Sequence, residues 1–210
     1  MKLEFTLGDY FRADHSFEER PNFSARFKEF LIVLYSIMRA SVPLLKTAED
    51  ACEQKITNED RDLNLLLKEY YHEHSLEEEN HDEWLLNDLT LLDIPREQVI
   101  SVKPRSIVGE LVGSQYYWIH HLHPVTLLGY ILVLEGYPLN PGDLDRLMKK
   151  TGFSKEAFRT LADHSSLDVH HLEELDRKLD EFPISKEQES WITVNAMYTV
   201  AKCAQILDSI

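Results

Sequence analysis

The chain has little cysteine and little basic charge. Its two cysteines, Cys52 and Cys203, form no CxxC-type spacing, so we expect neither disulfides nor a metal–thiolate or iron–sulfur site. Against 37 acidic residues stand only 22 basic ones, which gives a formal net charge of −15. Such a surface repels the phosphates of nucleic acids and anionic lipids. The composition therefore excludes nucleic acid as an expected partner.

Long apolar runs are also missing. The first twenty residues contain no apolar core of a signal peptide, and no run approaches the ~18 apolar residues that span a bilayer. We therefore expect a cytoplasmic protein without a membrane partner. The 210 residues, 43% of them hydrophobic, suffice for one sizeable core, so we expect a single domain over residues 1–210.

Alternating patterns typical of β-strands are nearly absent. Apolar residues instead recur every three or four positions, which predicts an all-α chain. The short connections, marked by proline, glycine and asparagine, favour antiparallel neighbours and hence a bundle of about seven helices. The predicted helices cover residues 23–55, 62–92, 105–122, 124–137, 141–151, 154–181 and 185–208.

Polar residues interrupt the apolar face of the helix predicted over 154–181. His164, Asp168 and His171 fall within or beside the stripe formed by residues such as Leu161 and Leu175, and their spacing puts all three side chains on one face. An unpaired carboxylate in a core costs several kcal/mol, so Asp168 needs a bound ion or a network of donors.

The helix predicted over 62–92 repeats this arrangement. His74, Glu78 and His81 stand in its inner stripe with the same spacing as the first set. Glu77 borders the same face on the other flank, and we prefer Glu78 because it preserves the parallel. Two sets of histidines and an acid on separate helices are rarely produced by structural need alone.

Glu135 is a third isolated acid. It is the only charged residue between Pro124 and Pro138, in a segment that is apolar nearly all round. Imidazole and carboxylate ligands together suit iron, manganese or zinc, and bundles that hold two irons present glutamate and histidine from several helices. Four histidines and three carboxylates are too many for one zinc and about right for two ions. The predicted metal ligands are Glu78, His81, Glu135, His164, Asp168, His171 and His74.

These stretches resemble the haem-oxygenase-like diiron oxidases, a group of iron-containing redox enzymes. The likeness rests on "HSLEEENHDEWLLNDL", "HPVTLLGYILVLEGYP" and "ADHSSLDVHH", in this order along the chain. It implies a seven-helix, haem-oxygenase-like bundle that uses dioxygen and an electron donor to oxidise a small molecule such as a fatty acid, an amino acid or a derivative. It also implies two irons held by Glu78, His81, Glu135, His164, Asp168 and His171. A homodimer is a further possibility.

His74 departs from the family pattern. Some members have a glutamate seven residues before the first metal-binding histidine, and this sequence has His74 there. The departure leaves open whether His74 is itself a ligand, whether one site binds weakly, or whether only one ion, iron or manganese, is retained. Glu77, Tyr71 and Asp88 are candidates for orienting the ligands from behind, and the substrate is expected in an apolar pocket between helices.

Three other hypotheses compete with this one. "GELVGSQ", with Gly109 and Gly113, is similar to the segment of haem oxygenases that lets haem approach the backbone, although close helix packing also explains such glycines. A haem enzyme needs an early axial histidine, for which only His15 is available, and it has no use for two sets of buried acids and histidines. The second alternative is a cofactor-free member of the same superfold, either an oxidase or a thiamin-degrading hydrolase. The hydrolase normally presents a nucleophilic cysteine, and neither Cys52 nor Cys203 lies near the motif helices in sequence. The third alternative is a non-catalytic helical protein that binds a metal or a partner.

Overall fold

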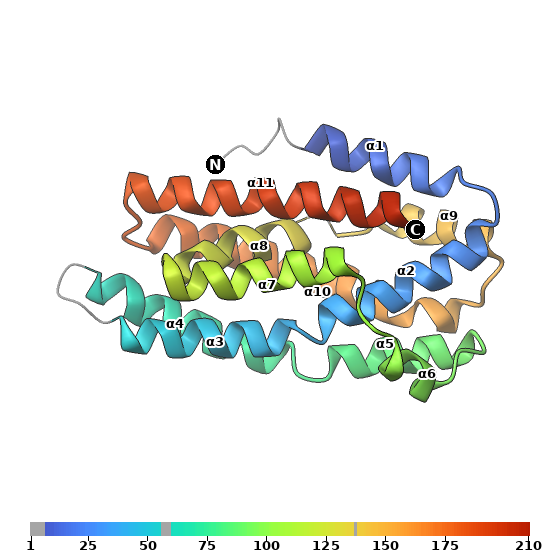
Figure 1. Cartoon of the computed structure of the whole chain (residues 1–210), viewed down its shortest axis with the longest axis horizontal. Helices are drawn as coiled ribbons and strands as arrows, with labels where there is room; N and C mark the ends of the chain where they lie inside the picture. The colour runs from blue at the N-terminus through green and yellow to red at the C-terminus, as the bar shows by residue number, and fades with distance from the viewer. Residues whose placement is uncertain (1–6, 56–59, 137) are drawn as a thin grey trace.

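The computed structural model describes residues 7–55, 60–136 and 138–210. Within these ranges the chain consists of helices and their connections, without strands (Figure 1). The fold class is therefore all-α, as predicted. The helices are α1 (Leu7–Glu18), α2 (Phe23–Met38), α3 (Ser41–Gln54), α4 (Arg61–Glu77), α5 (His81–Leu91), α6 (Arg96–Ser101), α7 (Ser106–His121), η1 (Pro124–Thr126), α8 (Leu127–Leu134), α9 (Pro141–Thr151), η2 (Lys155–Phe158), α10 (Arg159–Glu181) and α11 (Lys186–Ser209).

Each of the seven predicted helices has a counterpart, but two of them are broken. The helix predicted over 23–55 divides into α2 and α3 at Arg39 and Ala40, and the helix predicted over 62–92 divides into α4 and α5. Helices α1 and α6 lie outside the predicted set. Residue 137, the predicted end of the fourth helix, lies outside the described residues.

The break between α4 and α5 corrects one expectation directly. His74, Glu78 and His81 were expected on one helix, but α4 ends at Glu77 and α5 begins at His81. Asn80 causes the change of direction, because it adopts a left-handed backbone conformation with φ 71°. Asparagine tolerates this conformation better than most residues. The set of His74, Glu78 and His81 therefore spans a helix break, whereas the other set lies on one helix, α10.

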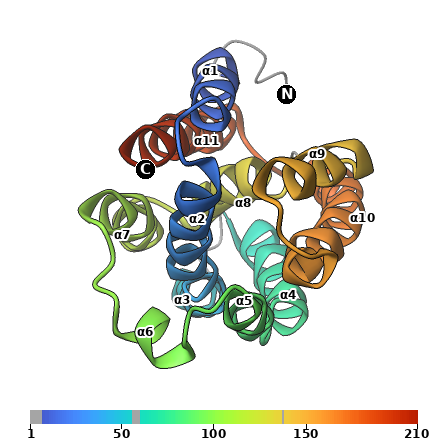
Figure 2. The same cartoon turned by 90° about the vertical axis from the view of Figure 1, so that its right-hand side faces the viewer.

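Helix α8 runs through the middle of the bundle. In the end-on view it lies between α11 above and α4 below (Figure 2). Gly129 permits the close approach of α8 to α11, because a Cβ atom there would lie 2.2 Å from the carbonyl oxygen of Ile192 and 2.9 Å from the amide nitrogen of Ala196. This contact holds the C-terminal end of α8, where Glu135 follows, inside the bundle.

One region corrects the expectation about apolar runs. Residues Phe23–Gln54 contain an 18-residue window that is apolar enough, by length and composition alone, to cross a membrane. Core helices of soluble proteins meet the same criterion, and helix α2 contributes Phe27, Leu31 and Val33 to the hydrophobic core of the bundle. Within the bundle, 33% of the window is buried.

Candidate metal centre

Helix α10 directs three polar side chains into the bundle. His171 is buried, and the side chains of His164 and Asp168 are 19% and 14% exposed. The Oδ1 atom of Asp168 lies 3.7 Å from Nδ1 of His164 and 4.0 Å from Nδ1 of His171. His170, the neighbour expected on the outer side of the helix, is exposed. The predicted polar face of this helix is thus present.

A first group joins α10 to α4 and to the end of α8. His74, Glu135 and His171 each offer one ligand atom, and these atoms lie within 4.8 Å of one another. The Nε2 atom of His74 shares a hydrogen bond of 3.0 Å with Oε1 of Glu135. The Nδ1 atom of His171 lies 3.3 Å from Oε2 of the same carboxylate. Glu135 therefore faces one histidine with each of its oxygens.

A second group lies beside the first. Glu78, His81 and His164 offer ligand atoms that are again within 4.8 Å of one another. The Nδ1 atom of His81 is 3.2 Å from Oε1 of Glu78, and the rings of His81 and His164 lie 4.7 Å apart. Because Asp168 contacts His164 of this group and His171 of the first, it links the two groups. All seven predicted residues are thus brought together, from α4, the α4–α5 break, α5, the end of α8 and α10.

Unsatisfied polar atoms provide a test of whether this cluster fits a metal. Buried polar atoms in folded proteins nearly always have a hydrogen-bond partner. Five buried atoms of the cluster have none: His81 Nδ1, Glu135 Oε2, His164 Nε2, Asp168 Oδ1 and His171 Nδ1. Two histidines and a carboxylate in each group are a ligand set that suits iron and related divalent ions. The residues of the cluster therefore fit bound metal.

Charge pairing shifts the pKa values of His74 and Glu135 in the first group. Burial lowers the pKa of His74, but the carboxylate of Glu135 outweighs this effect and raises it to about 9. Burial raises the pKa of Glu135, but His74 and His171 outweigh it and lower the value to about 2. Burial also raises the pKa of Asp168, more than the nearby imidazole of His164 lowers it. In the absence of a metal, the first group is thus held together as an ion pair.

The two adjacent glutamates have different surroundings. Glu78 is buried beside His81, whereas the side chain of Glu77 is 46% exposed. The Oε2 atom of Glu77 lies 3.8 Å from Nδ1 of His74 and 3.5 Å from Nε2 of His171. These are the ring nitrogens opposite those that face Glu135. Glu77 is therefore placed behind two imidazoles, and Glu78 belongs to the second group.

The other two candidates for orienting the ligands bond elsewhere. The hydroxyl of Tyr71 donates to the carbonyl oxygen of Pro124 at 2.9 Å. The carboxylate of Asp88 accepts from the amide nitrogen of Thr160, at the start of α10, at 2.7 Å. Both residues support helices of the site, but neither has a described contact with the seven residues. Their described hydrogen bonds therefore support the helices that carry the ligands rather than the ligands directly.

An internal cavity of about 300 Å³ borders the cluster. Its wall includes His74, Glu78, Glu135, His164 and Asp168, and the rest is mostly apolar. An apolar pocket between helices was predicted, but not the contribution of α1, because no helix was predicted over residues 7–18. Apolar residues spaced three or four apart in this segment are the signal that could have revealed it.

The haem hypothesis finds no support in this cavity. A Cβ atom at Gly109 or Gly113 would meet no atom within 4 Å, so neither glycine serves close helix packing. Helix α7, which contains both, contributes no residue to the described cavity wall. His15, the early histidine, is exposed. The described residues thus offer no arrangement of an axial histidine opposite a glycine-bearing helix.

Comparison with known proteins identifies relatives in family and in fold. The model of the family described as iron-containing redox enzymes matches residues 29–198. A domain of unknown function with a heme oxygenase-like fold from Shewanella denitrificans has a TM-score of 0.79 and 19% identity, covering 97% of this chain and 84% of its own. A TenA homolog from Pseudomonas syringae pv. tomato has a TM-score of 0.66 and 11% identity, covering 97% and 89%. No curated protein sequence matches the chain.

Proposed function

The chain belongs to the family of iron-containing redox enzymes and has a haem-oxygenase-like fold, and from this premise we propose that it is a non-haem diiron oxidase or oxygenase. Its reaction uses dioxygen to oxidise a small organic molecule, such as a fatty acid, an amino acid or a derivative. The observation that supports this proposal is the pair of adjacent groups, each with two histidines and a glutamate, linked by Asp168.

In this proposal each group holds one iron. His74, Glu135 and His171 hold the first, and Glu78, His81 and His164 hold the second. Bound iron supplies the redox chemistry with dioxygen, for which protein side chains alone have no suitable group. Asp168 contacts a histidine of each group, so its carboxylate would lie beside both groups and help to hold the bound iron. Manganese, or a single ion, is the alternative for the same ligands.

The surrounding residues orient the ligands and exclude water from the site. Glu77 faces the ring nitrogens of His74 and His171 that point away from Glu135. A carboxylate in this position fixes the orientation of an imidazole and makes it a stronger ligand. The apolar wall of the cavity excludes water and receives the substrate next to the cluster. The proposal also includes an external electron donor, because reduction of dioxygen consumes electrons.

The direct experiment is anaerobic loading of the full chain with ferrous iron, followed by exposure to dioxygen. We expect about two irons per chain, and dioxygen consumption that is faster than with the same iron in buffer. The spectrum of the oxidised protein should lack the intense Soret band of haem. Asp168→Asn should lose iron and slow the consumption at least about tenfold, because it removes a charge that lies beside both groups.

Asp163→Asn is the matched control. Asp163 lies on the same helix, is exposed, and pairs with Arg159 rather than with the cluster. It should leave iron content and dioxygen consumption unchanged. Tight iron binding without accelerated dioxygen consumption would favour the non-catalytic, metal-binding alternative, and an equal effect of both substitutions would contradict the assignment of Asp168.

A further inference from the structure

The cavity extends away from the metal centre along α2. Its lining residues on α2 and α3 recur every three or four positions, so they form one continuous face. That face is apolar and rich in phenylalanine. An elongated apolar molecule matches a cavity with such a wall. The residues concerned are Phe23, Phe27, Phe30, Leu34, Ile37 and Leu44.

Helices α1 and α9 close the end of the cavity beside the phenylalanines. Asp14, Phe17 and Glu18 of α1 and Arg146 of α9 belong to the wall there. This end has a polar character that the α2 face lacks. Helix α1 precedes the region matched by the family model, residues 29–198. The family match therefore says nothing about this end of the cavity.

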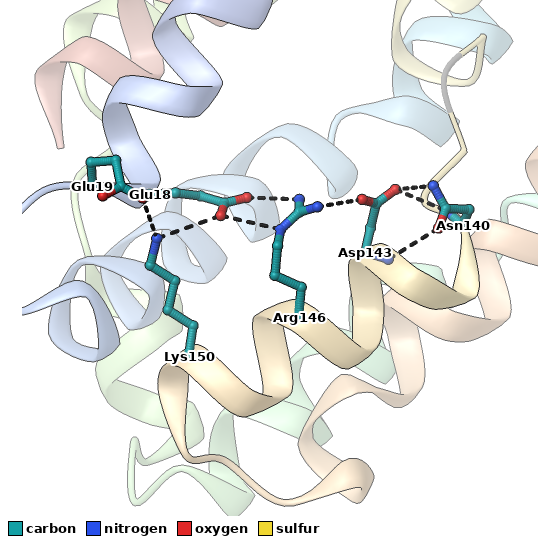
Figure 3. Close-up of polar contacts among 6 residues, drawn as sticks. All are labelled: Glu18, Glu19, Asn140, Asp143, Arg146 and Lys150. Carbon is teal, nitrogen blue, oxygen red and sulfur yellow. Dashed lines mark hydrogen bonds and ion pairs between the residues drawn. The ribbon is translucent and has the colours of Figure 1, made fainter.

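The two cations of α9 at this end are already paired (Figure 3). Arg146 lies 2.9 Å from Oε1 of Glu18 and 2.7 Å from Oδ1 of Asp143. Lys150 lies 2.9 Å from Oε1 of Glu19 and 3.6 Å from Oε2 of Glu18. Neither residue therefore offers a free cation to a carboxylate ligand.

Asp14 is a further carboxylate of the cavity wall at this end. It is partly buried, and no described residue forms a hydrogen bond or an ion pair with it. Burial raises the pKa of Asp14, and the neighbouring carboxylates of Glu18 and Asp143 raise it further, which together outweigh the opposite effect of Arg146 and His15. The carboxylates in this network outnumber the two cations Arg146 and Lys150. They belong to Asp14, Glu18, Glu19 and Asp143. A positively charged group placed in the cavity would relieve this repulsion.

A buried hydroxyl on the same cavity wall also lacks a partner. Tyr130 of α8 lines the cavity and is only 4% exposed, yet its hydroxyl has no hydrogen bond. Buried hydroxyls without a partner are uncommon because their desolvation is not compensated. This second observation is independent of the acidic residues, and it indicates that the cavity receives a molecule that has a hydrogen-bonding group.

We propose that the cavity binds an elongated apolar molecule with a protonated amine, whose ammonium group contacts Asp14 while its opposite end faces the metal centre. This inference rests on the proposed function, because it takes the cavity as the substrate chamber. It narrows the substrate class to amines with an apolar body. It also excludes a carboxylate as the group recognised beside α1.

Binding measured without turnover tests the proposal. The full chain is loaded with zinc, which is not redox-active, and titrated calorimetrically with decylamine, decanoate and 1-decanol, each below its micelle-forming concentration. We expect decylamine to bind about tenfold more tightly than the other two. Asp14→Asn should remove this preference and leave the affinity for 1-decanol unchanged. Asp14→Lys should reverse it in favour of decanoate.

Glu19→Gln is the matched control. Glu19 lies on the chain next to Glu18 and pairs with Lys150, but it does not line the cavity. It should leave all three affinities unchanged. Tighter binding of decanoate than of decylamine by the unaltered chain would overturn the proposal, as would an unchanged amine preference in both Asp14 variants. Neither result involves iron or dioxygen, so failure here is distinguishable from failure of the proposed function.

Discussion

His74 and Glu135 share a partly buried hydrogen bond of 3.0 Å that joins α4 to the residue following α8. The two residues are 61 positions apart in the sequence. The contact therefore brings an imidazole of α4 against a carboxylate that is otherwise surrounded by an apolar segment.

The first prediction concerns the pH dependence of stability without metal. The pKa of His74 rises from 6.5 to about 9 on folding, so its stabilising effect is complete below pH 6.5 and disappears as the pH rises through about 9. The pKa of Glu135 falls from 4.5 to about 2, so its effect is complete above pH 4.5 and disappears as the pH falls through about 2. The pair thus stabilises fully between pH 4.5 and 6.5.

Urea unfolding of the metal-free chain at several pH values measures this dependence. The free energy of unfolding should fall between pH 6.5 and about 9. Glu135→Gln should flatten this slope, because it removes the carboxylate that raises the pKa of His74. An equally steep slope in the variant would show that other groups cause the dependence.

The second prediction concerns the number of metal ions. His74→Ala should reduce the metal content from two ions to one, because only the first group contains His74. His81→Ala should have the same effect through the second group. Elemental analysis after removal of free metal measures both. His72→Ala is the control, because His72 is exposed on α4 and contacts Glu49 instead. Two ions retained in His74→Ala would mean that His74 is not a ligand.

The third prediction concerns Glu77. Because its carboxylate lies behind the rings of His74 and His171, Glu77→Gln should weaken metal binding by about 10–100-fold. Competition with a chelator of known affinity measures this loss. Glu73→Gln is the matched control, since Glu73 is exposed one turn earlier on the same helix. Equal affinities in the two variants would remove Glu77 from the metal centre.

The fourth prediction concerns the packing that holds Glu135 in place. Gly129→Ala should lower the free energy of unfolding by about 1–3 kcal/mol, because the added methyl group meets the backbone of α11. Gly113→Ala should raise it by about 0.5–1 kcal/mol, because the site is open and alanine favours the helix. Thermal and urea unfolding measure both. Destabilisation by both substitutions to the same extent would contradict the close α8–α11 contact.

The sequence by itself determined the helical class, most helix positions and the residues that interrupt the apolar faces. These features depend on local periodicity, because a residue's place on a helix face follows from its spacing to neighbours three and four positions away. For that reason His164, Asp168 and His171 were found on one face. Glu135 was recognised because a lone charge in an apolar segment must be compensated wherever the segment packs.

Only the tertiary structure decided how these residues are grouped. The left-handed Asn80 separates Glu78 and His81 from His74, so that His74 joins Glu135 and His171, while Glu78 and His81 join His164. Helix breaks at ordinary residues, and the choice of which faces meet, depend on packing between distant segments that no local pattern records. The same reason explains why the sequence analysis did not separate Glu77 from Glu78 by geometry, and missed the contribution of α1 to the cavity.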